Sequence, residues 1–433
     1  MALDGIVISS LVKEFNETLT GGKIAKIAQP ENDELLLTIK NFRNQYRLLI
    51  SAGASLPLIY LTGDNKPSPM TAPNFCMLLR KHIANGKILR IWQPGLERII
   101  HFEIEHLNDL GDLCHKVLTV EIMGKHSNII FCDDNNKIID SIKHVGVQMS
   151  SVREVLPGRE YFIPHTQDKE NPLTITEERF RETVLTKPLP LSKALYMTLT
   201  GISPLIAEEI CHRASLESDQ SANSFSDTEA THLYHTFSRL MEDVKNGNFT
   251  PTVVYDGREP LEFSALPLTL YQDKRVETFE SISAVLENYY AMKNTITRIR
   301  QRSSDLRRIV NTALERNRKK YELQLRQLKD TEKREKFRVY GELINTYGYN
   351  LEPGAKKLEA LNYYSNEMVT IPLDDTLTPQ ENAQKNFDRY NKLKRTYEAL
   401  SELITQTKAE IDHLESISTA LDIALSEADL VQI

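Results

Sequence analysis

The sequence predicts an α+β protein with a strand-rich amino-terminal domain, a helical module, and a long antiparallel coiled coil that carries a small tip domain. Three observations predict it. Short apolar runs separated by turn residues fill the first 172 residues, apolar residues at helical spacing follow, and two heptad seams occupy the last third. A chain of 433 residues also exceeds what one hydrophobic core usually serves, so several domains are expected.

The amino-terminal domain, residues 1–172, is expected to be rich in strands because its apolar and β-branched runs are short and end at Gly, Asn or Asp. The clearest predicted strands cover 35–39, 46–50, 99–104 and 117–122. The best predicted helix covers 72–83, with Pro73 near its start and basic residues at its far end.

A helical module with a connecting segment is expected over 173–270, and its central feature is a helix-hairpin-helix pattern. Gly201 permits the tight turn, Ser203 can cap the second helix, and Pro204 suits the first helical position. Such a hairpin leaves backbone N–H groups where a phosphate is favoured, so Gly201, Ile202 and Ser203 are candidate phosphate ligands. Packing alone is the alternative, since many such hairpins bind nothing.

The coiled coil is predicted from two heptad seams separated by a break. The first arm, 271–336, has seam positions Val285, Tyr289, Met292, Ile296, Ile299, Ser303, Leu306, Val310 and Ala313. After a register shift near Asn317, the seam continues through Tyr321, Leu325 and Leu328. The second arm, 381–433, has Tyr390, Leu393, Tyr397, Leu400, Ile404, Thr407, Ile411 and Leu414. An arm of about 50 residues would reach roughly 75 Å. Residues 337–380, punctuated by Gly341, Gly348 and several prolines, are predicted to form the tip domain.

Charge is distributed unevenly along the chain. The formal net charge is −7, yet residues 298–336 carry 14 Lys or Arg against six Asp or Glu. A segregated basic segment is typical of a phosphate-binding surface, although a solvated helix face would show the same excess. The candidate phosphate-binding residues of this segment are Arg298, Arg307, Arg308, Arg316, Arg318, Lys319 and Lys320.

Motifs for catalysis are absent from the sequence. It contains no phosphate loop, dinucleotide fingerprint, His-Glu-x-x-His or Gly-x-Ser-x-Gly pattern, and its four cysteines lack metal-ligand spacing. His101 and His106 flank two glutamates, but no further ligands accompany them. We therefore expect no catalytic residues, cofactor or metal. No apolar run spans a membrane and no secretory signal opens the chain, so a cytoplasmic protein without a membrane partner is expected.

The stretch Met-Gly-Lys-His-Ser-Asn-Ile-Ile-Phe, residues 123–131, is expected to connect two strands, with Gly124 in the turn. Lys125 supplies a positive charge, and His126 and Asn128 supply hydrogen-bond donors, which suits an RNA backbone contact better than catalysis. Whether His126 contacts RNA or only holds the loop stays open.

Two further sites are notable for their context. Asp4 precedes Gly5 at the start of the fold, and Glu97-Arg98 follows the turn Gln93-Pro94-Gly95. A carboxylate beside a guanidinium can orient the Arg side chain toward a phosphate or a ribose hydroxyl. A surface ion pair is the alternative interpretation of such a dipeptide.

Taken together, these motifs resemble the bacterial NFACT family, the RqcH proteins, many of which carry the name fibronectin-binding protein A. The resemblance runs from the first residues to beyond 400, with the motifs in the family's order. They are 4–7, 22–30, 75–82, 123–130, 152–158, 201–204, and 373–374 with 381–385.

The resemblance implies a ribosome quality control factor with tRNA-binding and rRNA-binding roles in protein biosynthesis. Such proteins bind the large (50S) ribosomal subunit carrying peptidyl-tRNA, and recruit alanyl-tRNA for template-free alanine tailing. It implies that Asp4, Glu97 and Arg98 engage tRNA, and that the ribosome, not this chain, performs peptide transfer. A surface adhesin that binds fibronectin is the alternative function.

The sequence departs from the family's pattern at two points. Glu97 stands where the family has Asp, which places the carboxylate one methylene further out. Members also continue into an RNA-binding domain called NFACT-R, whereas this sequence ends at Ile433. We expect it to be part of a longer protein, and a naturally short member is the alternative.

The amino-terminal domain and hairpin of the family also resemble the formamidopyrimidine-DNA glycosylase fold. Those enzymes use an amino-terminal Pro as nucleophile, while this chain has Ala2 and Leu3, so glycosylase chemistry is not expected.

Overall fold

The computed structural model describes residues 3–165, 168–424 and 429–430, without the side chains of 296–298, 300 and 423. The chain divides into two compact units, residues 1–294 and 295–433, and each is described by itself. Helix α7 (Ile282–Asp330) contributes to both, with its residues through Asn294 belonging to the first unit.

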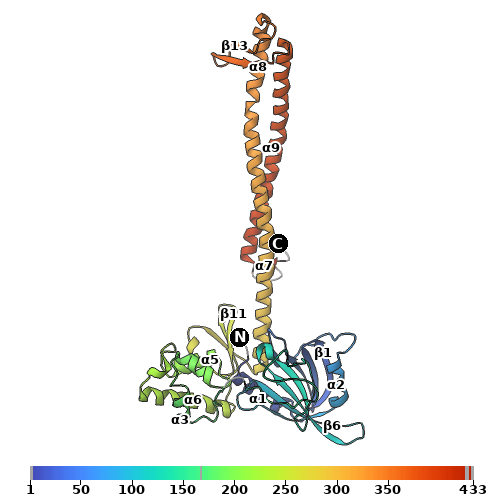
Figure 1. Ribbon diagram of the computed structural model, residues 1–433, viewed down its shortest axis with the longest axis vertical. Helices are drawn as coiled ribbons and strands as arrows, with labels where there is room; N and C mark the ends of the chain where they lie inside the picture. Colours follow the sequence, from blue (N-terminus) through green and yellow to red (C-terminus); the bar gives the residue numbers. More distant parts are fainter. Residues whose placement is uncertain (1–2, 166–167, 425–428, 431–433) are drawn as a thin grey trace. The chain divides into compact units, whose positions relative to one another are not determined.

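The first unit is built on an antiparallel sheet, which has nine strands among the described residues, in the order β4-β3-β2-β1-β5-β6-β7-β8-β9 (Figure 1). The four strands predicted from the sequence are confirmed as β2, β3, β6 and β7. The strands are β1 (Lys23–Glu31), β2 (Glu34–Asn41), β3 (Asn44–Ser51), β4 (Leu58–Thr62), β5 (Lys87–Trp92), β6 (Ile99–Leu107), β7 (Leu113–Glu121), β8 (Asn128–Asp133) and β9 (Ile138–Ser141).

Two helices accompany this sheet. Helix α1 (Gly5–Thr18) buries Ile8, Leu11 and Phe15 completely in the main core. Helix α2 (Asn74–Ile83) confirms the predicted helix, with Pro73 at its N-cap and Phe75, Cys76, Leu79 and Ile83 buried. The chain's first helix is therefore anchored in the core of the unit, which fixes the position of the residues just before it.

The helical module of the first unit contains α3 (Glu177–Thr183), α4 (Leu191–Thr198), α5 (Pro204–Arg213) and α6 (Asp227–Lys245). Helices α4 and α5 form the predicted hairpin, with Gly201 at φ +75° and the Ser203 side chain accepting a hydrogen bond from the N–H of Ile206. A three-stranded sheet follows, in the order β11-β10-β12, made by β10 (Thr252–Asp256), β11 (Glu259–Ser264) and β12 (Arg275–Thr278).

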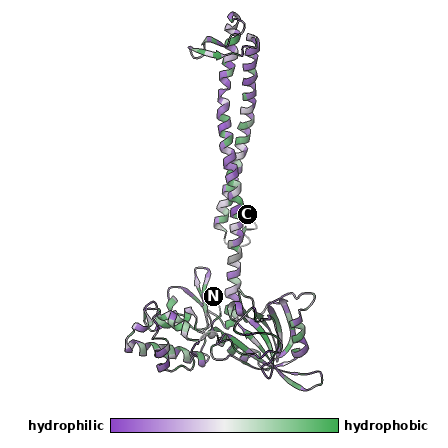
Figure 2. Cartoon of the chain, in the orientation of Figure 1, coloured by the Kyte–Doolittle hydropathy of each residue, from purple (hydrophilic) through white to green (hydrophobic). Residues whose placement is uncertain are grey.

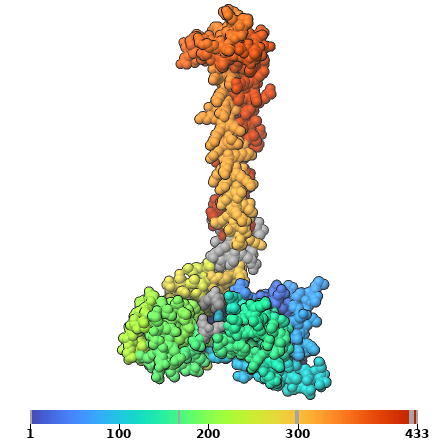
Figure 3. All heavy atoms as spheres, viewed as in Figure 1, coloured from blue at the N-terminus to red at the C-terminus, as the bar shows by residue number. Residues whose placement is uncertain are grey.

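The second unit is an antiparallel helical hairpin. Along α7 and α9 (Pro379–Ile423), Arg307 pairs with Asp422 at 3.0 Å and Arg318 pairs with Glu415 at 2.8 Å, so rising numbers on one helix meet falling numbers on the other. Figure 3 shows the side chains of the two helices against one another, and in Figure 2 apolar positions are interspersed among hydrophilic ones. The predicted antiparallel coiled coil is confirmed.

The seam predicted for the first arm is correct in part. Val310 is buried against Ile411 and Leu414, but Val285 and Tyr289 are buried in the core of the first unit instead. Leu325 was predicted at the seam and is wrong, because its side chain is 42% exposed and Gln324 is buried in its place. After the register shift, the buried seam position is therefore 324, one residue before the predicted position 325.

The tip is a small two-stranded sheet, β13 (Lys357–Asn362) paired with β14 (Glu367–Pro372), next to helix α8 (Arg334–Tyr347). Gly341 was expected to interrupt the helix, but it lies within α8. A Cβ at this position would lie 2.8 Å from the Phe387 ring, so the glycine permits close helix packing. Gly341 is thus a contact point between two helices rather than a break in one.

The short helical turns in the chain are η1 (Gly124–His126), η2 (Ala222–Ser224), η3 (Thr269–Tyr271), η4 (Thr331–Lys333) and η5 (Gly348–Asn350). Within the described part of the chain, no helix combines the length and apolarity that crossing a membrane would require.

Candidate nucleic-acid interface

Three segments that lie far apart in the sequence meet at one backbone junction in the first unit. The N–H of Gly5 donates to the carbonyl oxygen of Gly201 at 2.9 Å. A Cβ added to either glycine would lie 2.1 Å from the carbonyl oxygen of Leu96, a distance that real contacts do not reach. Glycine is therefore required at both positions, and the junction brings together the segments that contain Asp4, Glu97-Arg98 and the hairpin.

Asp4 links two helix N-termini across this junction. Its Oδ1 accepts from the N–H of Val7 in α1, and its Oδ2 accepts from the hydroxyl of Ser203, each at 2.8 Å. Ser203 in turn caps α5. Burial raises the pKa of Asp4, while the hydrogen bonds from Val7 and Ser203 and the charge of Arg98 oppose the shift. Because Asp4 is only 7% exposed and both its oxygens are occupied, it holds the junction rather than presenting a free carboxylate.

The turn before Glu97 is tied to the same junction by Gln93. Its side-chain amide donates to the carbonyl oxygens of Gly5 at 2.9 Å and of Glu97 at 2.8 Å. The N–H of Glu97 closes the turn onto Pro94, and the N–H of Ile122 donates to the carbonyl oxygen of Arg98 at 2.9 Å. The backbone of Glu97-Arg98 is thereby fixed from both sides.

Arg98 lies between two hollows in the surface of the first unit. One hollow, of about 500 Å³, is lined by Glu97, Arg98, His165, Lys169 and Asn171 among others. The second, of about 580 Å³, is lined by Asp4, Arg98, Lys169, Tyr196 and Ser203 among others. Among the described residues, the Arg98 guanidinium makes no hydrogen bond or ion pair, although the side chain is partly buried.

Burial shifts the pKa values of Arg98 and of the ionisable groups near it. Burial raises the pKa of Glu97, and the nearby His165, Arg98 and Lys169 oppose the shift. Burial lowers the pKa of Lys169, and the positive charge of Arg98 lowers it further. Burial also lowers the pKa of Arg98, which Asp4 and Glu97 oppose. Two cations therefore face the same hollows, an arrangement that an anionic group would stabilise.

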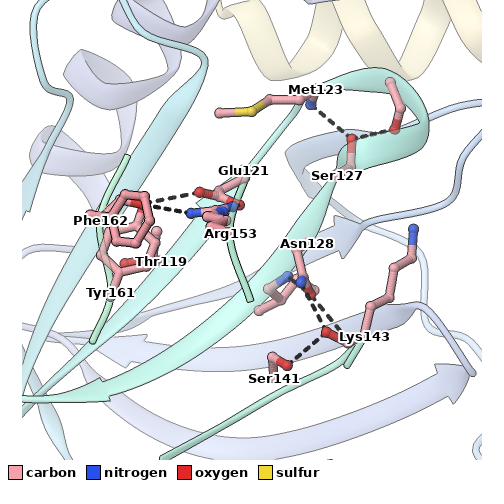
Figure 4. Close-up of polar contacts among 12 residues, drawn as sticks. Thr119, Glu121, Met123, Ser127, Asn128, Ser141, Lys143, Arg153, Tyr161 and Phe162 are labelled. Atoms are coloured by element: carbon pink, nitrogen blue, oxygen red, sulfur yellow. Dashed lines mark hydrogen bonds and ion pairs between the residues drawn. The ribbon is translucent and has the colours of Figure 1, made fainter. Parts of the chain in front are cut away.

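The loop at 123–127 connects β7 and β8 as predicted (Figure 4). The hydroxyl of Ser127 accepts from the N–H of Met123 at 2.8 Å and donates to the carbonyl oxygen of Gly124 at 2.7 Å. Gly124 has φ +57°. Lys125 and His126 lie at the surface of this turn, while Met123 lines the first hollow.

Asn128 does not present the donor that the sequence suggested. Its side chain is buried, its amide donates to the carbonyl oxygen of Lys143 at 3.0 Å, and its Oδ1 accepts from the N–H groups of Ile129 and Lys143. Figure 4 shows these bonds between the strand and the segment at 141–143. The expected RNA contact of Asn128 is therefore wrong, because the side chain is buried. Asn128 instead joins the start of β8 to the segment at 141–143.

The motif 152–158 also has an internal role. Arg153 forms an ion pair with Glu121, whose side chain is fully buried, and the hydroxyl of Tyr161 donates to Glu121 Oε2 at 3.0 Å (Figure 4). Arg153 donates as well to the carbonyl oxygen of Phe162 at 2.7 Å. This network holds the end of β7, directly before the loop.

The histidines that flanked two glutamates do not form a ligand cluster. His101 bonds to Thr119 at 2.7 Å, and burial lowers its pKa to about 4. Glu103 pairs with His115 at 3.3 Å. In the part of the chain that the structure describes, no group of three or more acidic, histidine or cysteine side chains could hold a metal ion.

The basic candidates of the second unit separate into two groups. Arg307, Arg308 and Arg318 are in ion pairs with Asp422, Asp305 and Glu415. Arg316, Lys319 and Lys320 are exposed and make no ion pair with the described residues. The side chain of Arg298 lies outside the described residues.

Sequence reasoning missed three residues of the junction: Gln93, Lys169 and Asn171. Gln93 stands in a turn that the sequence did show, but its hydrogen bond to Gly5 spans 88 positions and so leaves no local pattern. Lys169 and Asn171 lie in an irregular segment without hydrophobic periodicity. Only the fold brings them to Arg98.

The fold defines an α+β protein that has a strand-rich unit and a long helical hairpin. At the junction in its first unit, the Arg98 guanidinium makes no hydrogen bond or ion pair within the described ranges. The family model for NFACT N-terminal and middle domains matches residues 4–433. The chain belongs to this family, as its motifs had indicated.

The curated relatives agree with this assignment. The Rqc2 homolog RqcH of Bacillus subtilis (strain 168) is 36% identical over 437 residues, covering 100% of this chain and 74% of the relative. The ribosome quality control complex subunit NEMF of Homo sapiens is 24% identical over 204 residues, covering 47% of this chain and 18% of that protein. The chain is thus a homologue of ribosome quality control proteins.

Solved structures match the first part of the chain. The amino-terminal part of the fibronectin/fibrinogen-binding protein from Streptococcus suis has 30% identity and a TM-score of 0.56, covering 67% of this chain and 99% of that one. The MutM (Fpg) protein from Thermus thermophilus is a looser match, with 12% identity and a TM-score of 0.29 over 56% of this chain and 77% of that one.

Proposed function

We propose that this chain is a ribosome quality control factor that binds large ribosomal subunits carrying peptidyl-tRNA and recruits alanyl-tRNA for template-free alanine tailing. The observation that carries the proposal is Arg98, a partly buried guanidinium that makes no hydrogen bond or ion pair with the described residues, at a junction of family motifs. A buried charge is costly unless it is paired, so the site is complete only when an anion is bound. Phosphate groups of RNA are the anions that such a factor meets.

Each predicted tRNA-binding residue has a distinct part in this proposal. Glu97 and Arg98 contact tRNA directly, because both line the first hollow and their side chains make no hydrogen bond or ion pair in the described ranges. Asp4 acts through position, since it caps α1 and accepts from Ser203. Lys125 and His126 are available for a backbone contact from the surface turn.

The hairpin supports the same site. The N–H groups of Gly201, Ile202 and Ser203 donate to no acceptor among the described residues, and Gly201 lines both hollows. Backbone N–H groups before a helix favour phosphate oxygens. Ile202 contributes only this backbone group, because its side chain is buried in the core.

The helical hairpin supplies a second RNA surface, directed at ribosomal RNA. Arg316, Lys319 and Lys320 are its available cations, while Arg307 and Arg318 hold α7 to α9. Phosphate contacts of this kind position a protein on RNA without reading its sequence.

The proposed factor performs no bond chemistry. Peptide transfer belongs to the ribosome, and the chain raises the effective concentration of alanyl-tRNA by holding it in place. Neither a cofactor nor a metal enters this proposal.

The test is recovery of the tagged natural protein from cells, followed by measurement of co-purifying large subunits and sequencing of bound tRNA. We expect both large subunits and alanine tRNA to be enriched, and tRNA to be lost when Glu97 and Arg98 are replaced together. Recovery of neither large subunits nor tRNA would contradict the proposal.

A fibronectin-binding adhesin is the second candidate, because the Streptococcus suis protein with 30% identity bears that name. Protease treatment of whole cells separates the two functions. An adhesin is digested from outside, whereas a ribosome-associated factor is protected until the cells are opened.

A further inference from the structure

Lys169 stands out in the hollows beside Arg98. Two features set it apart: it lines both hollows, as Arg98 does, and no sequence motif contains it. Pro164 and His165, which come shortly before it in the sequence, also line the first hollow. The fold therefore places a second cation beside Arg98 from a distant part of the chain.

The ammonium group of Lys169 is held in place but keeps donors free. It donates to the carbonyl oxygen of Tyr196 at 3.1 Å, on the last turns of α4. An ammonium has three donors, and this is the hydrogen bond that its Nζ makes among the described residues. The remaining donors are available to a bound group.

Lys169 and Arg98 line the same two hollows. Burial lowers the pKa of Lys169, the charge of Arg98 lowers it further, and Glu97 opposes the shift. Like charges placed together destabilise the free site and are relieved by an anion between them. Asn171 lines the same hollow, and its Oδ1 is occupied by the N–H of Leu173 at 3.0 Å, which leaves its side-chain N–H₂ as a further donor.

We propose that Lys169 is a second phosphate ligand of the site, which together with Arg98 holds one phosphate group of the bound RNA, with Asn171 donating beside them. This inference rests on the proposed function for the source of the phosphate. A guanidinium gives directional paired donors and an ammonium gives a compact charge, so the two cations are complementary ligands of one phosphate.

The test replaces Lys169 by Met, which keeps the aliphatic stem and removes the charge, and by Arg, which keeps the charge. The matched control is Lys193→Met, because Lys193 is a lysine of α4 that lines neither hollow. Binding of purified alanine tRNA to the full protein is measured at several salt concentrations, and denaturant unfolding checks that each variant is folded.

We expect K169M to weaken tRNA binding about tenfold and to reduce the slope of log K against log salt by about one, with K169R closer to wild type and K193M unchanged. Inorganic phosphate is the second probe, followed through the rise in melting temperature that it causes. This rise should shrink in K169M and persist in K193M.

The outcomes separate the two proposals. Normal tRNA binding and a normal phosphate effect in K169M would overturn the role of Lys169 and leave the proposed function standing. A phosphate effect that depends on Lys169, in a protein that does not bind tRNA, would support the phosphate site and overturn the proposed function. The absence of both tRNA and phosphate binding in the wild type would overturn both.

Discussion

Arg153 and Arg98 belong to the same unit and to motifs of the same family, yet their surroundings differ completely. Arg153 is paired with buried Glu121 and bonded to the carbonyl oxygen of Phe162, and its side chain is 9% exposed. Arg98 is held by its backbone while its guanidinium has no partner among the described residues. The first arginine holds the fold together, and the second is the one that we propose to bind a phosphate.

This difference shows that residues of the same family's motifs can have different roles, which the sequence alone does not distinguish. Arg153 and Asn128 find side-chain partners within the unit and support the loop after β7. The junction of Gly5, Leu96 and Gly201 uses backbone contacts to fix its position and leaves side-chain donors for other use. Membership of a motif does not distinguish residues that hold the fold from residues that we propose to bind RNA. The side-chain hydrogen bonds and ion pairs of each residue do.

The largest expected effect comes from breaking the paired arginine. Arg153→Met should lower the free energy of unfolding by about 3–5 kcal/mol, because Glu121 would be left as a buried charge without its partner. Arg98→Met should change it by less than about 1 kcal/mol, since no pair within the described ranges is lost. Denaturant unfolding of both variants measures the difference. Equal losses would show that Arg98 is as structural as Arg153.

The second expected effect concerns two glycines with positive φ. Gly201→Ala should cost about 2–4 kcal/mol, because its Cβ would lie 2.1 Å from the carbonyl oxygen of Leu96. Gly124→Ala is the matched control: its φ is also positive, but no described atom lies within 4 Å of the new Cβ, so about 1 kcal/mol is expected. Thermal unfolding should show a larger loss of stability in Gly201→Ala than in Gly124→Ala. A smaller loss in Gly201→Ala would contradict the claim that the junction requires glycine at position 201.

A smaller effect depends on pH and concerns Glu97, whose carboxylate makes no hydrogen bond with the described residues. Burial raises the folded-state pKa of Glu97 above its unfolded value, so its contribution to stability is present at low pH and is lost as pH rises through the folded pKa. Glu97→Gln should therefore raise stability at pH 7, by less than about 1 kcal/mol because the group is partly exposed. Unfolding at several pH values should show the gain vanish below about pH 4. A gain that grows toward low pH would contradict this assignment.

The smallest effect on stability is expected in the helical hairpin. Arg318→Ala removes an exposed pair with Glu415 and should cost about 0–1 kcal/mol. Replacing Lys319 and Lys320 by Ala removes no ion pair with the described residues, and should leave stability unchanged while weakening association with large subunits. Sedimentation with purified subunits at two salt concentrations checks this. If the double variant associates with large subunits as strongly as wild type does, Lys319 and Lys320 do not contribute to RNA binding.

Local chemistry made much of the fold predictable. The hairpin at Gly201, Ser203 and Pro204 was foreseen because turn and cap residues act on their immediate neighbours. The antiparallel helical hairpin was foreseen from heptad spacing, but Leu325 and Gly341 were misplaced, because a register shift and a close helix contact depend on the partner helix.

The site was predictable only in pieces. Asp4, Glu97 and Arg98 were selected from the sequence, but their convergence depends on contacts between residues up to 199 positions apart, which no local pattern contains. Gln93 and Lys169 were missed for the same reason, since each acts through a carbonyl oxygen that only the fold brings near.

The most direct test of the central claim measures tRNA affinity and unfolding free energy together for Arg98→Met and wild type. A guanidinium kept for a ligand predicts that the variant is as stable as wild type and binds alanine tRNA at least about tenfold more weakly, with a salt slope reduced by about one. Unchanged affinity, or a loss of affinity explained entirely by unfolding, would contradict the claim that Arg98 is kept free for RNA.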